Sequence, residues 1–100
     1  RDFTYIDDIV DGIKIAVKKN YKYEIFNLGN NQSTPLMYLI ELIEKELKMK
    51  SKINFLPMQP GDVKESNADI DYSKKMLAFS PKVNIEEGVR TFIDWFKEYK

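Results

Sequence analysis

Residues 1–19 read RDFTYIDDIVDGIKIAVKK, and along them the hydrophobic period changes from that of a strand to that of a helix. Phe3 and Tyr5 alternate with polar residues over 1–6, which is typical of an extended segment. Over 7–19 the apolar residues recur at helical spacing, with carboxylates in the first turn and lysines in the last, as the helix dipole favours. The pattern predicts a strand leading into a helix over 7–19, with a buried stripe of Ile6, Ile9, Val10, Ile13 and Val17.

The same alternation continues through the middle of the chain. Residues 23–28 form a short apolar run before Gly29-Asn30-Asn31, which predicts a second strand and a turn. We expect the next helix over 34–48, capped by Ser33 or Thr34 and with Pro35 in its first turn. The buried stripe predicted for the helix over 34–48 is Leu36, Leu39, Ile40, Ile43 and Leu47. A third strand is predicted over 52–56, before Pro57.

The last third of the chain begins with the loop 58–62, MQPGD, which contains a Pro-Gly turn. A short helix is predicted over 71–77, closed by Pro81. A final helix over 84–99 begins at Asn84, three residues before Glu87, a spacing typical of a capping box. Its predicted stripe is Ile85, Val89, Phe92, Ile93 and Phe96. The whole chain, 1–100, thus predicts an α/β fold of about four helices and three short strands, with no Pro/Gly-rich linker.

Composition excludes several classes of function. The chain has 100 residues, enough for one small domain or part of a larger one. Its 16 basic and 16 acidic residues cancel, so it lacks the basic surface expected of a protein that binds nucleic acid or a membrane. The absence of Cys excludes disulfides and thiolate catalysis, and the absence of His excludes the commonest general base. Since Cys and His are also the commonest metal ligands, we expect no metal site. With no membrane span and no signal peptide in the sequence, the default expectation is a soluble, cytoplasmic protein.

The acidic residues near helix starts favour structural roles. Asp7 and Asp8 are adjacent, so on a helix they would point about 100° apart and make a poor acid/base pair. A position in the first helical turn explains both. Asp69 and Asp71 are likewise predicted to be turn and capping residues.

Two features have a functional alternative. Arg1 is either an ordinary surface charge or an anion clamp, since a guanidinium presents a rigid fork that suits phosphate oxygens. The loop 58–62 is either a tight turn or a segment that offers the Gln59 amide and the Asp62 carboxylate to the hydroxyls of a sugar or ribose. Neither feature identifies a function alone.

Several motifs in a fixed order resemble a known family. They are RDFTYIDDIV at 1–10, FNLGN at 26–30, MQPGDV at 58–63 with AD at 68–69, EEG at 86–88 and FIDWF at 92–96. Together they resemble the C-terminal part of the NAD-dependent nucleotide-sugar epimerases and dehydratases of the extended short-chain dehydrogenase/reductase family. Within that family the resemblance is greatest to the UDP-glucuronate 4-epimerases of polysaccharide biosynthesis.

The resemblance implies the substrate-binding C-terminal portion of an extended Rossmann-type enzyme, with a UDP-sugar as partner and an intact enzyme that is a homodimer. The family binds NAD through a Gly-rich loop in an N-terminal Rossmann domain and reacts through a Tyr-x-x-x-Lys pair. Neither motif is in this chain, because no tyrosine is followed by Lys four positions later. We therefore expect no catalytic residue here, NAD only in the intact enzyme, and an inactive fragment.

Position by position, Arg1 matches the family Arg that contacts the nucleotide diphosphate. Asp62 matches the carboxylate that contacts the ribose or its neighbouring loop. Gln59 falls where galactose-type epimerases commonly have an Arg, which favours the glucuronate branch. Ala78 departs from the family pattern, which usually has Gly there. The polar stretch 64–67 also departs from it and leaves the substrate open.

Two alternatives remain at this point. The chain could be part of a nucleotide-sugar dehydratase or decarboxylase, whose distinguishing residues lie in the catalytic half. It could also be a non-catalytic binding module of the same fold.

Overall fold

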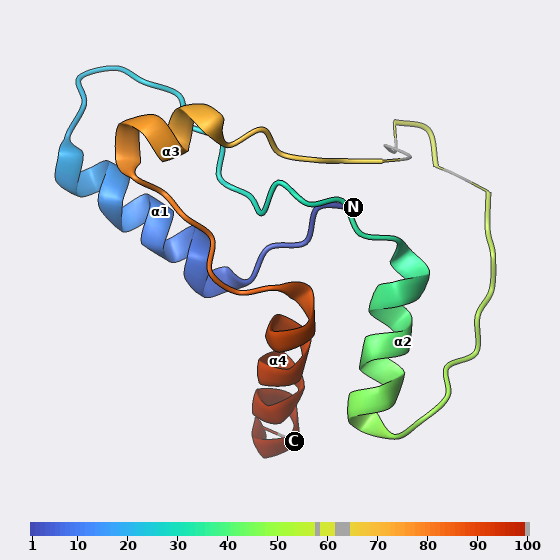
Figure 1. Ribbon diagram of the computed structural model, residues 1–100. Helices are drawn as coiled ribbons and strands as arrows, with labels where there is room; N and C mark the ends of the chain where they lie inside the picture. Colours follow the sequence, from blue (N-terminus) through green and yellow to red (C-terminus); the bar gives the residue numbers. More distant parts are fainter. Residues whose placement is uncertain (58, 62–64, 100) are drawn as a thin grey trace.

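Four helices organise the chain. The computed structural model describes residues 1–57, 59–61 and 65–99. The helices are α1 (Ile6–Lys19), α2 (Leu36–Leu47), α3 (Asp71–Leu77) and α4 (Ile85–Tyr99). They form two pairs, in which α1 contacts α3 and α2 contacts α4 (Figure 1).

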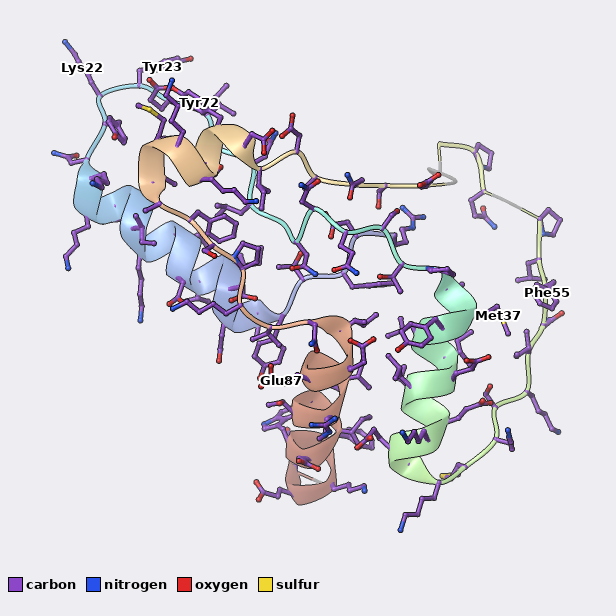
Figure 2. The ribbon with its side chains drawn as sticks, in the orientation of Figure 1. Lys22, Tyr23, Met37, Phe55, Tyr72 and Glu87 are labelled. Carbon is purple, nitrogen blue, oxygen red and sulfur yellow. The ribbon has the colours of Figure 1, made fainter. Side chains whose placement is uncertain are left out.

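The helix boundaries largely agree with the sequence pattern. The helix α3 matches its predicted range, and α1 begins one residue earlier than expected. At the start of α4, Asn84 Oδ1 accepts the backbone N–H of Glu87 at 2.8 Å, so the predicted cap is confirmed. The labelled Glu87 marks this first turn in Figure 2.

The predicted cap of α2 is wrong. Pro35, not Ser33 or Thr34, precedes the first helical residue, and its carbonyl oxygen accepts the N–H groups of Tyr38 and Leu39 at 3.1 and 3.4 Å. Ser33 and Thr34 are engaged elsewhere, because Thr34 N donates to Arg1 O at 2.7 Å and Ser33 Oγ donates to Ser66 O at 2.9 Å. The Ser33 side chain therefore holds a segment that is remote in sequence, whereas Thr34 pairs with Arg1 through its backbone, and neither side chain caps the helix.

The described residues contain one isolated antiparallel bridge, Asp2 with Ser33, and no longer strand. The segments 23–28 and 52–56 are therefore coil in this structure. A strand exists only where a second backbone pairs with it, and the described part of the chain supplies that pairing at one position. The three predicted strands stay predictions for a longer polypeptide.

Two carboxylates hold the coil segments in place. Asp2 Oδ2 accepts the backbone N–H groups of Ala68 at 2.8 Å and Asn31 at 3.0 Å, and Asp2 Oδ1 accepts that of Gln32 at 3.4 Å. Asp8 is buried, and its two oxygens accept the N–H groups of Lys82 and Val83 at 3.1 and 3.0 Å. The structural role predicted for Asp8 is thus confirmed, and its partner is the segment that leads into α4.

The main hydrophobic cluster lies between α1 and α3. Ile70, Leu77 and Phe79 are buried there, and five half-buried residues pack against them: Ile15, Ala16, Phe26, Leu28 and Ala68. Gly12 of α1 permits this contact, because a Cβ at that position would lie 2.7 Å from Leu28 Cδ2. The side of α1 that faces the core is therefore the one with Asp8, Gly12, Ile15 and Ala16.

The predicted buried stripes are only partly correct. In α1 the stripe is wrong, because Ile6, Val10, Ile13 and Val17 are exposed and Ile9 is half-buried. In α2, Leu36 is exposed and the other four positions are half-buried. In α4, Ile93 is buried and Ile85 and Val89 are half-buried, but Phe92 and Phe96 are exposed. Periodicity shows which residues share a helical face, but not whether anything covers that face.

The molecule is open for its length. Its radius of gyration is 16.1 Å and its extents are 48 × 36 × 19 Å. A compact domain of 100 residues would have a radius of gyration of about 13 Å. After α2 the chain runs past that helix, where Met37 and Phe55 both line a pocket between α2 and residues 51–56 (Figure 2). The small core and flat shape leave much apolar surface in solvent.

We expect replacement of Asp8 by Ala to lower the free energy of unfolding by about 2–3 kcal/mol, because two N–H groups lose their charged acceptor. Urea denaturation of the chain measures this change. Asp7→Ala is the matched control, since Asp7 is exposed in the same helical turn. It should cost only about 0.3–1 kcal/mol through the helix dipole. Equal losses in the two variants would contradict the structural role of Asp8.

Ala78 ends α3 with a φ of 55°, in the left-handed region that favours glycine. We expect Ala78→Gly to raise the free energy of unfolding by about 0.5–1 kcal/mol in a urea titration. Ala16→Gly, inside α1, should lower it by about 1 kcal/mol or more. A loss of stability in Ala78→Gly would show that the left-handed backbone is not the limiting strain at this site.

Candidate functional site

The backbone of Arg1 is anchored although its side chain is exposed. Thr34 N donates to Arg1 O at 2.7 Å, and the backbone nitrogen of Arg1 donates to Thr34 O at 3.0 Å. The next residue, Asp2, is half-buried and accepts three backbone N–H groups. The guanidinium therefore extends from a fixed point on the backbone into solvent.

Three segments that are distant in sequence meet beside Arg1: residues 1–2, 31–34 and 66–68. Ser66 lies in the third segment and contacts the other two. Its hydroxyl accepts the Asp2 N–H at 3.3 Å, and its carbonyl accepts from Ser33 Oγ at 2.9 Å. Asn67 Nδ2 donates to Asn31 Oδ1 at 3.1 Å. We call these three segments the Asp2 junction. The junction fixes where the chain arrives after the loop 58–62.

Gln59 is exposed and directly precedes the turn at Pro60-Gly61. Gly61 has a φ of 88°, so the tight turn predicted for this dipeptide is present, with glycine where it is required. Asp62 lies outside the described residues. Four residues after this loop, Ser66 is held at the Asp2 junction close to Arg1. The convergence of Arg1, Gln59 and Asp62 on one ligand stays a prediction.

Sequence reasoning missed two residues that position this region. Asp2 gave no signal beyond being a polar residue in an alternating segment, yet it joins three backbone segments. Ser73 is fully buried in α3 and donates to Asn27 O at 2.6 Å, which ties the 23–28 segment to that helix. Asp69 behaves as expected, because its Oδ1 accepts the Asp71 N–H at 3.1 Å just before α3.

A second candidate site is the cleft between α2 and α4, with a volume of about 450 Å³. Its lining is almost wholly apolar and includes Leu39, Ile43, Val89 and Ile93. A diphosphate or a sugar needs hydrogen-bond donors and acceptors, so this lining does not suit a nucleotide-sugar.

Polar contacts clamp the two ends of this cleft. Tyr38 Oη donates to Glu86 Oε2 at 2.5 Å, and Lys97 Nζ donates to Glu46 O at 3.1 Å. The first bond lowers the pKa of the Glu86 carboxyl and raises the pKa of the Tyr38 hydroxyl, because it favours the charged acid and the neutral phenol. These contacts hold α2 and α4 side by side and indicate a packing interface.

The residues of the chain do not fit NAD. A dinucleotide site needs glycines in a loop between a strand and a helix, where backbone N–H groups approach the pyrophosphate. Here Gly12 and Gly88 lie inside helices, and a Cβ on Gly29 would lie 2.5 Å from Ala68 Cβ. Close packing explains these three glycines, and the turn described above explains Gly61.

Among the residues that the structure describes, no group of three or more acidic side chains could hold a metal ion. Within the same residues, no helix is both long and apolar enough to span a membrane.

Comparison with known proteins identifies the relatives of the chain. No family model matches it. An uncharacterized protein of Methanocaldococcus jannaschii is 59% identical over the whole chain, which spans 31% of that protein. A UDP-glucuronate 4-epimerase of Thermodesulfobacterium geofontis is 42% identical over 98% of the chain, which spans 30% of that enzyme.

Solved structures give the same result for the fold. The UDP-glucuronic acid 4-epimerase of Bacillus cereus, in complex with UDP-glucuronic acid and NAD, matches all of the chain with a TM-score of 0.86 and 32% identity. The chain spans 32% of that enzyme. The resemblance seen in the sequence motifs is confirmed, and the fold is that of part of a Rossmann-type epimerase. The chain is thus homologous, over its whole length, to about a third of an NAD-dependent UDP-glucuronate 4-epimerase.

Proposed function

We propose that the chain is the C-terminal, substrate-binding portion of an NAD-dependent UDP-glucuronate 4-epimerase. In this proposal it binds the UDP part of the sugar nucleotide, while a preceding Rossmann domain binds NAD and supplies the catalytic pair. The intact enzyme would be a cytoplasmic homodimer. The observation that carries the proposal is the match of the whole chain to an epimerase whose structure holds UDP-glucuronic acid and NAD.

Arg1 is the proposed contact of the diphosphate. A guanidinium offers two parallel charge-assisted hydrogen bonds to phosphate oxygens, a geometry that the Lys ammonium does not reproduce. The backbone pair with Thr34 and the contacts of Asp2 fix the origin of this side chain. Ligand binding then has to order only the Arg1 side chain, not the segment that carries it.

Gln59 and Asp62 are the proposed contacts of the uncharged part of the nucleotide. A carboxylate beside a diphosphate would be repelled, so Asp62 is assigned to ribose hydroxyls, which can donate to it. Gln59 carries no charge, and its amide can both donate to and accept from neutral groups of the nucleotide. Arg1 would then be the cation that this chain directs at the phosphates, which makes it the most sensitive residue to test.

We expect Arg1→Ala, made in the intact enzyme, to weaken UDP binding roughly ten- to a hundredfold, since a lost charge-assisted bond costs about 1.5–3 kcal/mol. Arg1→Lys should recover only part of this loss. Arg90→Ala is the matched control, because Arg90 is an exposed arginine on α4. Isothermal titration with UDP measures all four proteins. Unchanged affinity in Arg1→Ala would return Arg1 to the class of ordinary surface charges.

The 100-residue chain alone should neither epimerise UDP-glucuronate nor bind NAD, because it lacks the cofactor loop and the catalytic pair. Sugar-nucleotide chromatography after incubation with NAD and UDP-glucuronate tests the first point, and fluorescence titration with NADH tests the second. The intact enzyme is the positive control and should form UDP-galacturonate. Turnover by the chain alone, or a decarboxylated or dehydrated product from the intact enzyme, would contradict the proposal.

A further inference from the structure

The helix α1 has an apolar face that nothing in the described part of the chain covers. The exposed fractions of its side chains are 65% for Ile6, 39% for Val10, 52% for Ile13 and 73% for Val17. These four residues lie within an arc of about 60° on an ideal helix. We call them the α1 stripe.

The stripe is distinct from the side of α1 that faces the core. Asp8, Gly12, Ile15 and Ala16 make that other side, which packs near α3 and Phe79 and is rotated by about 145° from the stripe. In Figure 1, α3 and the segment after it lie along one side of α1. Four charged residues of the helix lie on the arc between these two sides: Asp7, Asp11, Lys14 and Lys18.

A helix with two apolar faces and one charged face suits a position between two layers of protein, in which only the charged face contacts solvent. A helix on the surface of a complete domain has one apolar face, directed at the core. The stripe therefore indicates a second layer of protein that packs against α1. The radius of gyration of 16.1 Å, large for 100 residues, agrees with a missing layer.

We infer that the α1 stripe is the surface on which the remaining part of the epimerase packs, an inference that rests on the proposed function. The chain spans only 31% of its Methanocaldococcus jannaschii relative and 32% of the Bacillus cereus enzyme, so about two thirds of such a protein is available to form the second layer. Polypeptide that precedes Arg1 would arrive five residues before Ile6, at the start of the stripe.

The occupant must be apolar where it meets the stripe. Four aliphatic side chains in one row offer no hydrogen-bond donor or acceptor, so a charged or polar partner would lose its hydration without compensation. A surface of aliphatic side chains belonging to the preceding domain meets this requirement. A second copy of the chain, packed stripe to stripe, is the competing occupant that the test must separate.

Cysteine labelling tests the inference directly, because the chain contains no natural Cys. Ile13→Cys places a thiol on the stripe, and Lys14→Cys places one on the adjacent charged face. Each variant is made in the 100-residue chain and in the intact enzyme, with any other cysteine of the intact enzyme replaced by Ser. Maleimide labelling rates are then compared at several protein concentrations.

We expect Ile13→Cys to react roughly tenfold or more slowly in the intact enzyme than in the chain alone, since labelling then requires the interface to open. Lys14→Cys should react at similar rates in both. Equal rates for Ile13→Cys in the two proteins would overturn the inference. The inference would also be overturned if the labelling rate of Ile13→Cys in the chain alone fell as the protein concentration rose. That result would show that a second copy of the chain covers the stripe.

This experiment is independent of the epimerase assay. Protection of Ile13→Cys in an intact protein that does not turn over UDP-glucuronate would support the docking surface and contradict the proposed function. Turnover without protection would support the function and contradict the docking surface. Ile13→Asp gives a second measurement, because it should leave the melting temperature of the chain alone almost unchanged and lower that of the intact enzyme.

Discussion

The hydrogen bonds from backbone N–H groups to the Asp2 and Asp8 carboxylates are the interactions on which the structure depends. The described chain has one isolated β-bridge and four helices, so its coil segments cannot be held by a sheet. Each carboxylate instead gathers N–H groups from segments that lie 29 to 75 residues away in sequence. A carboxylate accepts such bonds more strongly than a neutral carbonyl does, which suits it to replace part of a missing ladder.

This arrangement also connects the fold with the candidate site. Asp2 organises the junction beside Arg1, so the residue proposed to bind phosphate is next in sequence to the residue that fixes its backbone. Asp8 joins α1 to the segment before α4 and so links the two helix pairs. Asp8 and the stripe lie on different sides of the same helix. The helix α1 therefore connects the proposed substrate-binding part with the part proposed to bind NAD.

Part of the fold and of the candidate site could be predicted because local signals were strong. The range of α3, the Asn84 cap and the turn at Pro60-Gly61 follow from short-range chemistry, and all are present. Ala78 stands out in the sequence because the family usually has Gly there. The left-handed backbone of Ala78 explains why glycine suits this position. The predicted cap of α2 was wrong because the Ser33 side chain and the Thr34 backbone bond to segments that are remote in sequence.

The sequence by itself determined the number and extent of the helices, the absence of Cys- and His-based chemistry, and the family motifs. These depend on residue identity and on spacings of a few residues. Only the tertiary structure decided which helical faces are covered, which carboxylate holds which segment, and where Arg1 is anchored. Such features depend on contacts between residues far apart in sequence, and periodicity carries no information about the partner. The α1 stripe shows the difference, since its spacing was evident from the sequence and its exposure only from the fold.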